Sequence, residues 1–502
     1  MPIRDLPRFR DLRDFLDHLE AAGDCSRVGA PVPLVHDMTE VHRRVLIAGG
    51  PALLFEHPLT ADGKSLPVPV LANLFGTRTR VAAGLGIAPE RLGELGELLV
   101  ALREPAPVEG VADALARWPL VKAALSTRVD TVAKAPVQAE VRRGSDVDLG
   151  CLPVQTCWPG EPAPLISWPL VLTRPPGSDS SSHYNVGVYR MQVLGPDRAI
   201  VRWLHHRGGA RHHALWAAEG RDMPVAVAIG ADPATILSAV LPLPETMSEI
   251  RFSGLLRGER PRLAEAVSVP MLVPADAEFV IEGLVSPTET APEGPYVDHT
   301  GYYNSVEPFP VMRVTAITHR REPIYLSTFT TRPPDEPSII ASTLNDVFVP
   351  LVRRQFPEVV DFWLPPAACS YRMAVVSIRK RYPGQARRVM MGLWGMLPQF
   401  SYTKLIVAVD EDIDPRSWDD VMWAIATRFD PSRDVARIER TPIDYLDFAS
   451  PLESLGGKLG LDATNKIGSE TSREWGRVAR VAPEVAARVD ALWPRLGLKP
   501  EK

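Results

Sequence analysis

Side chains that could do chemistry are concentrated between Tyr184 and Arg211, a segment that holds an amide (Asn185) and two arginines (Arg190 and Arg202). Runs rich in Val, Ile, Tyr and Trp flank a Gly-Pro-Asp-Arg turn, so the segment predicts a β-hairpin with both arginines on its strands. Each polar residue taken singly is more often a surface group. A His-His-Arg-Gly-Gly run follows, and glycine N–H groups can approach an anion closely, so the combination indicates a site for a phosphate-bearing ligand or a metal ion.

Three groups without sulfur make a candidate divalent-metal site: Asn185, His206 and Glu249. An amide oxygen, an imidazole and a carboxylate suit an ion such as Mn²⁺ or Mg²⁺ that also takes phosphate oxygens. Spacing alone does not select these residues, and each alone is more often a satisfied polar group.

A second candidate constellation is the segment Glu289–His299, in which Glu293 and Asp298 lie five residues apart. Its prolines and glycine force turns that can fold the two carboxylates toward one pocket. The alternative interpretation is a solvated acidic loop, and the residues alone leave both interpretations open.

Several long stretches of this sequence closely resemble the UbiD family of decarboxylases, whose cofactor is prenylated FMN. The resemblance extends from residue 10 to Lys466 and covers more than nine tenths of the chain. The stretches that show this resemblance are YNVGVYR, RWLHHRGGA, ADPATILSAV, MSEIRFSGLLRG, ETAPEGPYVDHTGYYN, RPPDEPSIIASTLNDVFVP and LGLDATNK.

The resemblance implies roles for three groups of residues. The catalytic residues are Arg190, Glu293 and Asp298, and the metal ligands are Asn185, His206 and Glu249. The residues that grip the prenylated flavin are Val188, Tyr189, Arg190, Arg202, Trp203, Leu204, Arg207 and Gly208. Arginines suit the flavin phosphate because they form bidentate hydrogen bonds. Val297 stands where the most similar family members usually carry glycine, which puts the backbone of the acidic segment in question.

The bond to be broken explains why such an enzyme needs a cofactor. Removing CO₂ from an aromatic ring leaves a carbanion that neither the ring nor a protein side chain can stabilise, so a cofactor must accept the electrons. In the family the modified flavin bonds covalently to the ring carbon, CO₂ departs, and an acid delivers a proton. An exposed aspartate has a pKa of about 3.9, so Asp298 must become protonated during turnover by burial or by exchange with the CO₂-leaving step.

The function that the resemblance implies is non-oxidative decarboxylation of 3-polyprenyl-4-hydroxybenzoate to 2-polyprenylphenol in ubiquinone biosynthesis. The alternatives are the same chemistry on another aromatic or heteroaromatic acid, an NAD(P)H-dependent flavin reductase, and a flavin-binding scaffold without turnover. The implied cofactors are prenylated FMN and Mn²⁺, with Mg²⁺ as an alternative and K⁺ as an optional further ion. The implied partners are a prenyl-FMN synthase that supplies the cofactor and further copies of the chain in a hexamer or a dimer.

Composition is that of an ordinary globular protein: 502 residues, 45% hydrophobic and 23% charged. A net charge of −5 gives no general attraction to nucleic acid. The four cysteines lack CxxC spacing, which argues against a disulfide framework or a thiolate zinc site, although Cys157 could line a pocket. No P-loop, HExxH or GxSxG pattern occurs. No apolar run could span a bilayer, so we expect a cytoplasmic protein. The implied polyprenyl substrate predicts a weak association with the inner face of the cell membrane.

Element patterns predict a multidomain α+β fold of three parts. Residues 1–115 form a small N-terminal α/β unit, with a helix over 9–19 and a loosely patterned helical connector near 105–125. Residues 116–332 consist of short strands with Gly/Pro turns, typical of a barrel or sandwich, which the resemblance specifies as a split β-barrel like that of flavin reductases. Residues 333–502 form a connecting helix, which Pro350 kinks or ends, and a C-terminal α/β oligomerisation domain followed by a charged helical stretch.

Overall fold

The structure is a computed structural model of the chain. It describes residues 6–103, 125–178, 180–205, 207–241, 243, 247–396 and 398–496. The predicted connector near residues 105–125 lies almost entirely outside the described residues. Among the described helices, none is long and apolar enough to cross a membrane.

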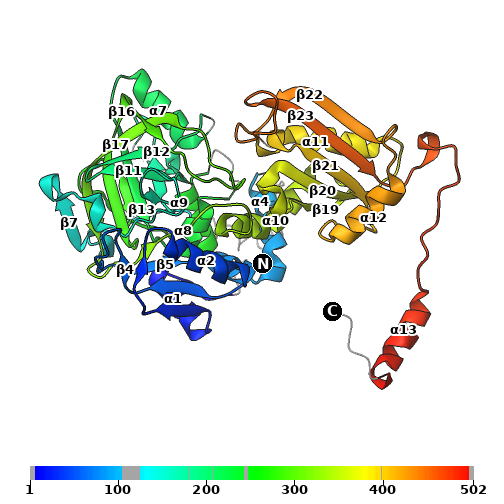
Figure 1. The fold of residues 1–502 in the computed structure, drawn as a ribbon, viewed down its shortest axis with the longest axis horizontal. Helices are drawn as coiled ribbons and strands as arrows, with labels where there is room; N and C mark the ends of the chain where they lie inside the picture. Colours follow the sequence, from blue (N-terminus) through cyan, green and yellow to red (C-terminus); the bar gives the residue numbers. More distant parts are fainter. Residues whose placement is uncertain are drawn as a thin grey trace, which may run out of the picture.

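The N-terminal unit is a four-stranded sheet in the order β1-β3-β5-β18, flanked by helices (Figure 1). Its strands are β1 (Cys25–Val28), β3 (Ala52–Phe55), β5 (Val70–Ala72) and β18 (Tyr325–Leu326), and a pair of short strands lies beside it, β2 (Val32–Pro33) and β4 (Pro58–Leu59). Its helices are α1 (Leu12–Ala21), α2 (Asp37–Ile47), α3 (Arg78–Leu85) and α4 (Leu92–Arg103). The helix predicted from residue 9 begins at Leu12, because Asp11 caps it by accepting a hydrogen bond from the Asp14 N–H.

The central part is one curled antiparallel sheet. Its strands are β7 (Glu140–Arg143), β8 (Leu165–Ile166), β9 (Leu170–Thr173), β10 (Asn185–Val188), β11 (Met191–Gly195), β12 (Arg198–Val201), β13 (Met223–Ile229), β16 (Phe279–Glu293) and β17 (Glu307–His319). The elements around it are α7 (Gly208–Ala218), α8 (Pro233–Ser238), α9 (Glu249–Arg257) and a small sheet of β6 (Asp130–Thr131), β14 (Arg262–Glu265) and β15 (Leu272–Pro274).

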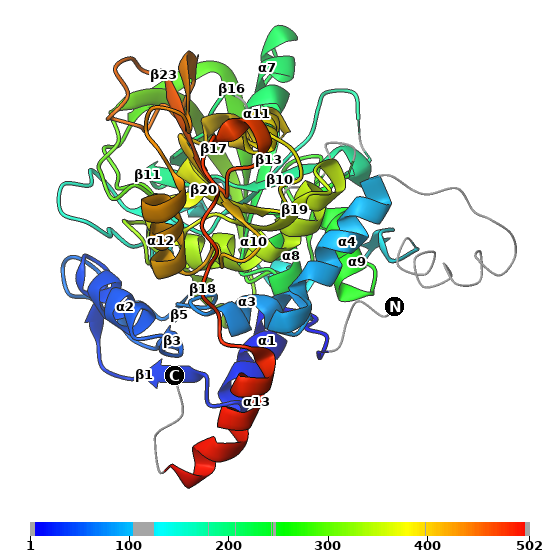
Figure 2. The same ribbon diagram turned by 90° about the vertical axis from the view of Figure 1, so that its right-hand side faces the viewer.

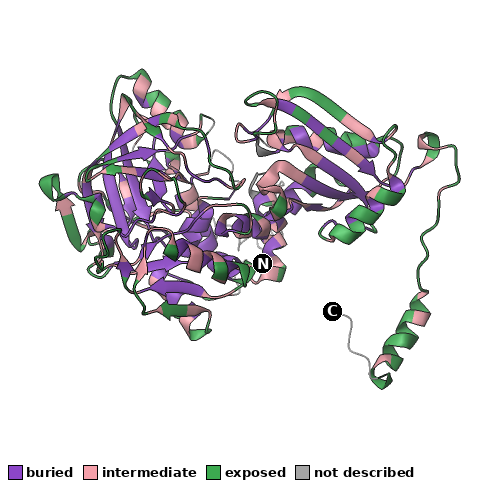
Figure 3. Cartoon of the chain, viewed as in Figure 1, coloured by how far each residue is buried: buried purple, intermediate pink, exposed green. Residues whose placement is uncertain are grey.

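The two ends of this sheet are joined by very short links. The strand order is β10-β9-β13-β16-β17-β12-β11-β8, yet only Tyr189 and Arg190 separate β10 from β11. Three residues likewise separate β8 from β9. The sheet must therefore curl until its ends meet, and we call the line where they meet the seam. Most buried apolar residues of the curled sheet belong to the main hydrophobic core, and Figure 3 shows much of the sheet in the colour of buried residues.

The prediction that both arginines lie on strands is wrong. Arg190 lies in the link between β10 and β11, and Arg202 follows the end of β12. The hairpin itself is confirmed, since β11 pairs with β12 across the Gly-Pro-Asp-Arg turn. The strand pairing stops at Arg190 because the chain there passes from one end of the sheet to the other.

The C-terminal part is a five-stranded sheet in the order β19-β20-β21-β23-β22, beside the curled sheet (Figures 1 and 2). Its strands are β19 (Val359–Trp363), β20 (Met373–Ile378), β21 (Leu405–Asp410), β22 (Val435–Pro442) and β23 (Leu455–Ala463), with the helices α11 (Gln385–Met396) and α12 (Trp418–Arg428). The connecting helix α10 (Glu336–Gln355) starts with a capping box of Asp335 and Ser338. It continues past Pro350 for five residues, so the proline does not end it.

The end of the chain departs from the prediction of one charged helix over residues 472–493. Only α13 (Pro483–Leu492) is helical, and the residues between Thr471 and Ala482 form an extended arm (Figure 2). Two side chains fasten the arm to the domain, since Trp475 Nε1 donates to Asn465 at 2.6 Å and Arg480 pairs with Asp412 at 2.8 Å. These tertiary contacts, absent from any local pattern, hold the arm extended.

The multidomain α+β class is confirmed, with a curled antiparallel sheet in the centre. The finer expectation of a split barrel like that of flavin reductases stays a prediction, as do the three domain boundaries.

Candidate active site

A buried carboxylate at the seam holds two arginines. Arg190 donates from Nε to Glu293 Oε1 at 2.8 Å and from Nη2 to Oε2 at 3.1 Å. Arg202 donates from Nη1 to the same Oε2. Glu293, the last residue of β16, is fully buried, so its charge requires these partners. The seam thus brings together two of the three predicted catalytic residues, Arg190 and Glu293.

Arg202 takes a place that the sequence did not indicate. It is 8% exposed, and besides Glu293 its guanidinium contacts Glu307 at 3.4 Å and the hydroxyl of Tyr445. Its charge also lies over the ring of Phe309, 4.8 Å from the centroid. Arg202 is therefore part of the cluster of Arg190, Arg202 and Glu293, which we call the acid–arginine cluster. Its expected role toward a flavin phosphate stays a prediction.

The third predicted catalytic residue, Asp298, lies on the loop of residues 294–306 that joins β16 to β17, which we call the acid loop. Asp298 is 5% exposed, and its Oδ1 accepts from the Thr300 N–H at 2.7 Å and from the Thr300 hydroxyl at 2.5 Å. Its Oδ2 is buried without a hydrogen-bond partner. An unsatisfied buried oxygen is costly unless a ligand, a water or a proton occupies it.

Asn304 fixes the acid loop against Arg190. Its side-chain oxygen accepts from Arg190 Nη2 at 2.8 Å and from the Tyr296 N–H at 3.0 Å. Val297, where glycine was expected, is buried and forms an isolated β-bridge with Tyr303. Val297 is not among the non-glycine residues with positive φ, so valine fits this backbone.

His299 follows Asp298 and faces the C-terminal domain. Its Nε2 lies 3.9 Å from Asp444 Oδ2 and has no hydrogen-bond partner. Burial lowers the pKa of His299, although Asp298 and Asp444 oppose this shift. The imidazole is therefore neutral at pH 7 and offers a free nitrogen beside the acid loop.

On the other side of the seam, β10 and the N-termini of α7 and α9 form the region predicted to hold the cofactor. Asn185 begins β10, and a Cβ at Gly208 would overlap its side-chain oxygen, so only glycine fits there. The hydroxyl of Tyr189 accepts from Asn185 Nδ2 and from the Gly209 N–H, both at 3.4 Å. Gly208 and Gly209 open α7, whose first N–H groups suit an anion.

Glu249 is the first residue of α9 and accepts from the Val186 N–H at 2.9 Å, next to Asn185. Burial raises its pKa to about 7, a carboxylate environment that a bound cation would stabilise. Ser248 Oγ, at the N-cap of α9, and Arg251 Nε, in its first turn, are buried without hydrogen-bond partners in the described part of the chain. His206 lies outside the described residues, and within the described part no cluster of three His, Cys, Asp or Glu residues could hold a metal. The oxygen donors of Asn185 and Glu249 nevertheless suit a hard divalent ion, and the helix N-termini beside them suit an anion.

The remaining predicted cofactor residues lie around these groups. Trp203 is 4% exposed, and its indole nitrogen has no hydrogen-bond partner among the described residues. Its ring lies edge-on to that of Tyr189, with the centroids 6.5 Å apart. Val188 and Leu204 are half-buried against hydrophobic clusters, and Arg207 is exposed at the N-cap of α7. An unpartnered indole N–H and an exposed guanidinium leave donors available to a ligand.

Sequence reasoning missed two residues of this region, Asn304 and Tyr445. Asn304 ends the stretch ETAPEGPYVDHTGYYN, so the resemblance could have drawn attention to it, whereas Tyr445 comes from the C-terminal domain and carried no local signal.

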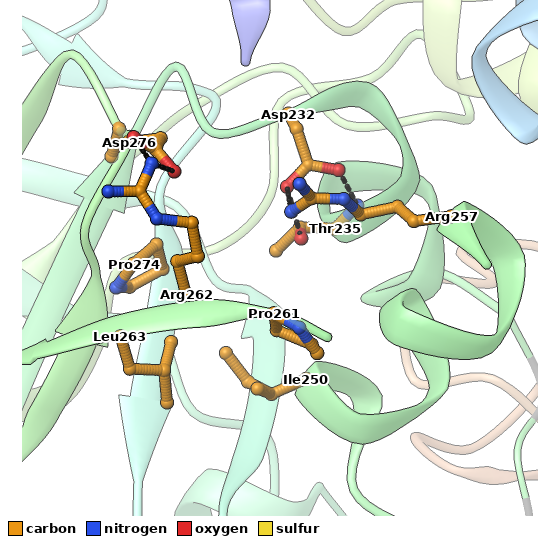
Figure 4. A pocket seen from close by; sticks show the side chains of 10 residues that line it. Asp232, Thr235, Ile250, Arg257, Pro261, Arg262, Leu263, Pro274 and Asp276 are labelled. Carbon is orange, nitrogen blue, oxygen red and sulfur yellow. Dashed lines mark hydrogen bonds and ion pairs between the residues drawn. The ribbon is translucent and has the colours of Figure 1, made fainter. Parts of the chain in front are cut away.

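Not every group of buried charges here is a ligand site (Figure 4). A cavity of about 10 Å³ lies among Asp232, Arg257, Arg262 and Asp276. Arg257 pairs with Asp232 at 3.3 Å and Arg262 pairs with Asp276 at 2.9 Å, as the dashed lines show. Such a space holds no more than one water. The first pair joins the N-terminus of α8 to α9, and the second joins β14 to the segment after β15.

Three models of known protein domains match this chain. Residues 16–99, 129–333 and 338–463 match, in turn, the N-terminal, Rift-related and C-terminal domains of 3-octaprenyl-4-hydroxybenzoate carboxy-lyase. The three matches together span most of the chain.

Similar proteins of known structure include the UbiD-class enzyme HmfF from Pelotomaculum thermopropionicum, described in complex with FMN. It is 28% identical with a TM-score of 0.78, over 96% of this chain and 99% of that chain. A dimeric evolved form of HmfF in complex with prenylated FMN is also 28% identical, with a TM-score of 0.75, over 95% and 98% of the two chains. Vanillic acid decarboxylase from Sedimentibacter hydroxybenzoicus, in a closed form, is 25% identical with a TM-score of 0.82, over 98% and 100%. The domain matches and the likeness along the whole length lead to one conclusion: this chain belongs to the UbiD family of carboxy-lyases.

Proposed function

We propose that this chain is a prenylated-FMN-dependent decarboxylase of an aromatic acid, with 3-polyprenyl-4-hydroxybenzoate as its substrate. The observation that carries the proposal is the cluster at the seam. A buried glutamate holds Arg190 in a fixed orientation, and Asp298, with an unpartnered buried oxygen, lies on the loop that Asn304 ties to that arginine.

Each residue of the cluster has a role that follows from its contacts. Arg190 binds and orients the substrate carboxylate through N–H groups that Glu293 and Asn304 keep in place. The reaction converts an aryl carboxylate and one proton into an arene and CO₂, so a proton must be delivered to the ring carbon. Asp298 is the proposed donor, since its Oδ2 is buried and without a partner. The bound cofactor supplies the electron sink that no side chain provides.

The proposed cofactor site is the other side of the seam. Asn185, His206 and Glu249 would hold Mn²⁺ or Mg²⁺, with K⁺ as an optional further ion. The first N–H groups of α7 and the exposed Arg207 would hold the phosphate. The support is chemical: oxygen donors, a carboxylate whose pKa burial has raised to about 7, and unpartnered donors on α9.

The prenylated substrate is supported by the descriptions of the three matched domains. The same site could serve a smaller phenolic acid, since vanillic acid decarboxylase has a similar structure. A prenyl chain would partition into membranes, so we propose weak, reversible association of this protein with the inner face of the cell membrane.

We also propose that the protein is a homo-oligomer. Helix α13 has no buried residue, and the apolar side chains of Val489, Leu492 and Leu496 are exposed on it and just beyond it. Exposed apolar side chains at helical spacing are typical of a helix that packs on a partner.

The experiment that tests the function is a cofactor-dependence assay. Protein produced together with a prenyl-FMN synthase is expected to release CO₂ from 3-polyprenyl-4-hydroxybenzoate without NAD(P)H, whereas protein produced without the synthase is not. Equal activity with unmodified FMN would contradict the cofactor assignment. Release of CO₂ only from vanillic acid or another small acid in a panel would favour the second substrate class, and bleaching of the flavin by NADPH would favour a reductase.

A further inference from the structure

Two hairpin tips meet between the curled sheet and the C-terminal domain. One is the acid loop between β16 and β17, and the other is the loop of residues 443–454 between β22 and β23, which we call the clamp loop. The two loops come from parts of the chain about 150 residues apart, and contacts between them and around them join the two domains.

The first contact is made by Tyr445 at the end of the acid–arginine cluster. Its hydroxyl accepts a hydrogen bond from Arg202 Nη2, and the guanidinium lies 5.9 Å from the centroid of its ring. Arg202 uses Nη1 to hold Glu293 Oε2, the same oxygen that Arg190 Nη2 contacts at 3.1 Å. Tyr445 is therefore separated by one side chain from the carboxylate that orients Arg190.

Two neighbours of Tyr445 make parallel contacts. Asp444 Oδ2 lies 3.9 Å from His299 Nε2, and it is fixed within its own domain by Arg372 at 3.3 Å and by Tyr371 at 3.4 Å. The ring of Phe448 meets that of Tyr302, on the acid loop, edge-on at 6.0 Å. Three contacts thus connect the clamp loop to the acid loop or to the arginine beside it.

We propose that Tyr445 is a positioning residue, supplied by the C-terminal domain, that completes the acid–arginine cluster only when the two domains are closed. The inference rests on the proposed function for its catalytic consequence. Its structural part, that Tyr445 holds the domains closed through Arg202, stands on the contacts alone.

Without the tyrosine, Arg202 keeps two acceptors, Glu293 and Glu307. Nη2 would then have only Glu307, at 3.4 Å, the residue that pairs with Glu293 across the β16–β17 ladder. A guanidinium that turns to shorten its contact with Glu307 loses its alignment with Glu293, whose buried Oε2 then depends more on Arg190. Arg190 would hold the substrate carboxylate less firmly, so the loss appears in the chemical step. Small polar contacts between domains permit relative motion, so the same change opens the clamp.

The test replaces the hydroxyl and keeps the ring. In cofactor-loaded protein, Tyr445→Phe is expected to lower kcat by about tenfold, which corresponds to about 1.4 kcal/mol. KM for the acid, flavin content and Tm are expected to stay at the values of the parent protein. Small-angle X-ray scattering of the same samples, matched for molar mass, is expected to show a larger radius of gyration. The matched control is Tyr382→Phe, because Tyr382 is an exposed tyrosine of the same domain.

Parental kcat or a parental radius of gyration in Tyr445→Phe would overturn the proposal, and so would an equal change in Tyr382→Phe. Tyr445→Ala, which also removes the ring, should have a larger effect than Tyr445→Phe. Equal kcat and an equal radius of gyration in the parent and both variants would also overturn the proposal. If the parent protein releases no CO₂ from any acid in the panel, the proposed function fails. The scattering comparison then decides the clamp by itself.

Discussion

This protein has two networks of buried charges, which differ in whether the polar atoms in and around them all have hydrogen-bond partners. The network at the seam joins Arg190, Arg202 and Glu293, and the network at the end of β23 joins Lys466 and Lys380 to buried acids. Around the first, Asp298 Oδ2, His299 Nε2 and Trp203 Nε1 are buried without hydrogen-bond partners.

The second network is saturated. Lys466 Nζ donates to Asp462 at 3.1 Å and to two backbone oxygens, and it also pairs with Asp434 at 3.4 Å. Lys380 Nζ donates to Thr464 at 2.8 Å and pairs with Glu470 at 2.6 Å. A fully satisfied network rigidifies a fold, whereas one with free atoms has room for a ligand or a proton. We infer that the motif LGLDATNK, at the second network, stabilises the fold, and we propose that the seam network takes part in the reaction.

Arg190→Ala should have the largest effect, because it breaks the seam network. We expect CO₂ release to fall by about 10⁴-fold, the upper end of what loss of an acid–base group costs, since the substrate carboxylate and Glu293 both lose a partner. The measurement is kcat/KM in cofactor-loaded protein. Arg198→Ala is the control, since Arg198 pairs with Glu289 at an exposed site and should leave activity unchanged. Parental activity in Arg190→Ala would remove this arginine from the site.

Asp298→Asn sharpens the comparison by preserving shape. The amide oxygen can still accept from the Thr300 N–H, but the side chain has no carboxylic proton to transfer. We expect a loss of about 10²–10⁴-fold in kcat with normal cofactor content and Tm. Glu289→Gln, an exposed acid on β16, is the matched control. If Asp298→Asn turned over like the parent, proton delivery would pass to Glu293 or to another group.

Lys466→Met should break the second network, and we expect it to lower the free energy of unfolding and to leave kcat unchanged. Removing one partner of a buried ion pair typically costs about 3–5 kcal/mol, because Asp434 and Asp462 keep buried charges. Urea unfolding is expected to show this loss, while the fraction that remains folded keeps parental kcat. Lys64→Met, at an exposed pair with Asp62, should change neither quantity. A large fall in kcat with unchanged stability would reverse the assignment of the two networks.

The buried pair of Glu336 and His42 tests whether an atom without a hydrogen-bond partner always marks a functional site. We expect the smallest of the effects on the protein from this pair. Glu336 Oε2 and His42 Nε2 both lack hydrogen-bond partners, but they lie 3.4 Å apart and face each other. Burial raises the pKa of Glu336 to about 7 and lowers that of His42 to about 3, so both groups are neutral in the folded protein at moderately acidic pH.

The sign of the expected pH dependence follows from the raised pKa. The stability that Glu336 contributes is fully present below its ordinary pKa of 4.5 and is lost as the pH rises through about 7. Glu336→Gln cannot ionise, so the parent should lose stability relative to this variant over that range, by at most about 1.4 kcal/mol per pH unit. The effect of His42 is common to both proteins and cancels. Parallel curves of unfolding free energy against pH would show that Glu336 ionises freely.

Much of the fold followed from the chain alone. The apolar spacing of Leu12, Phe15 and Leu19, the turn between β11 and β12, and the acidic start of α10 all act over a few residues, so local patterns indicated them. The stretches that resemble the family also indicated the family itself and the pair of Arg190 and Glu293. Those residues are 103 apart, and their contact is read from resemblance because no local pattern reports it.

Tertiary structure alone decided how the parts meet. The seam exists because β10 and β11, neighbours in sequence, pair at opposite ends of a curled sheet, and this took Arg190 off its predicted strand. The partner of Arg202 on the C-terminal domain and the extended arm before α13 depend on contacts between distant segments. Sequence determines which groups are available over short range. Which of them face one another is a property of packing, since pairing across a sheet and between domains depends on every element in between.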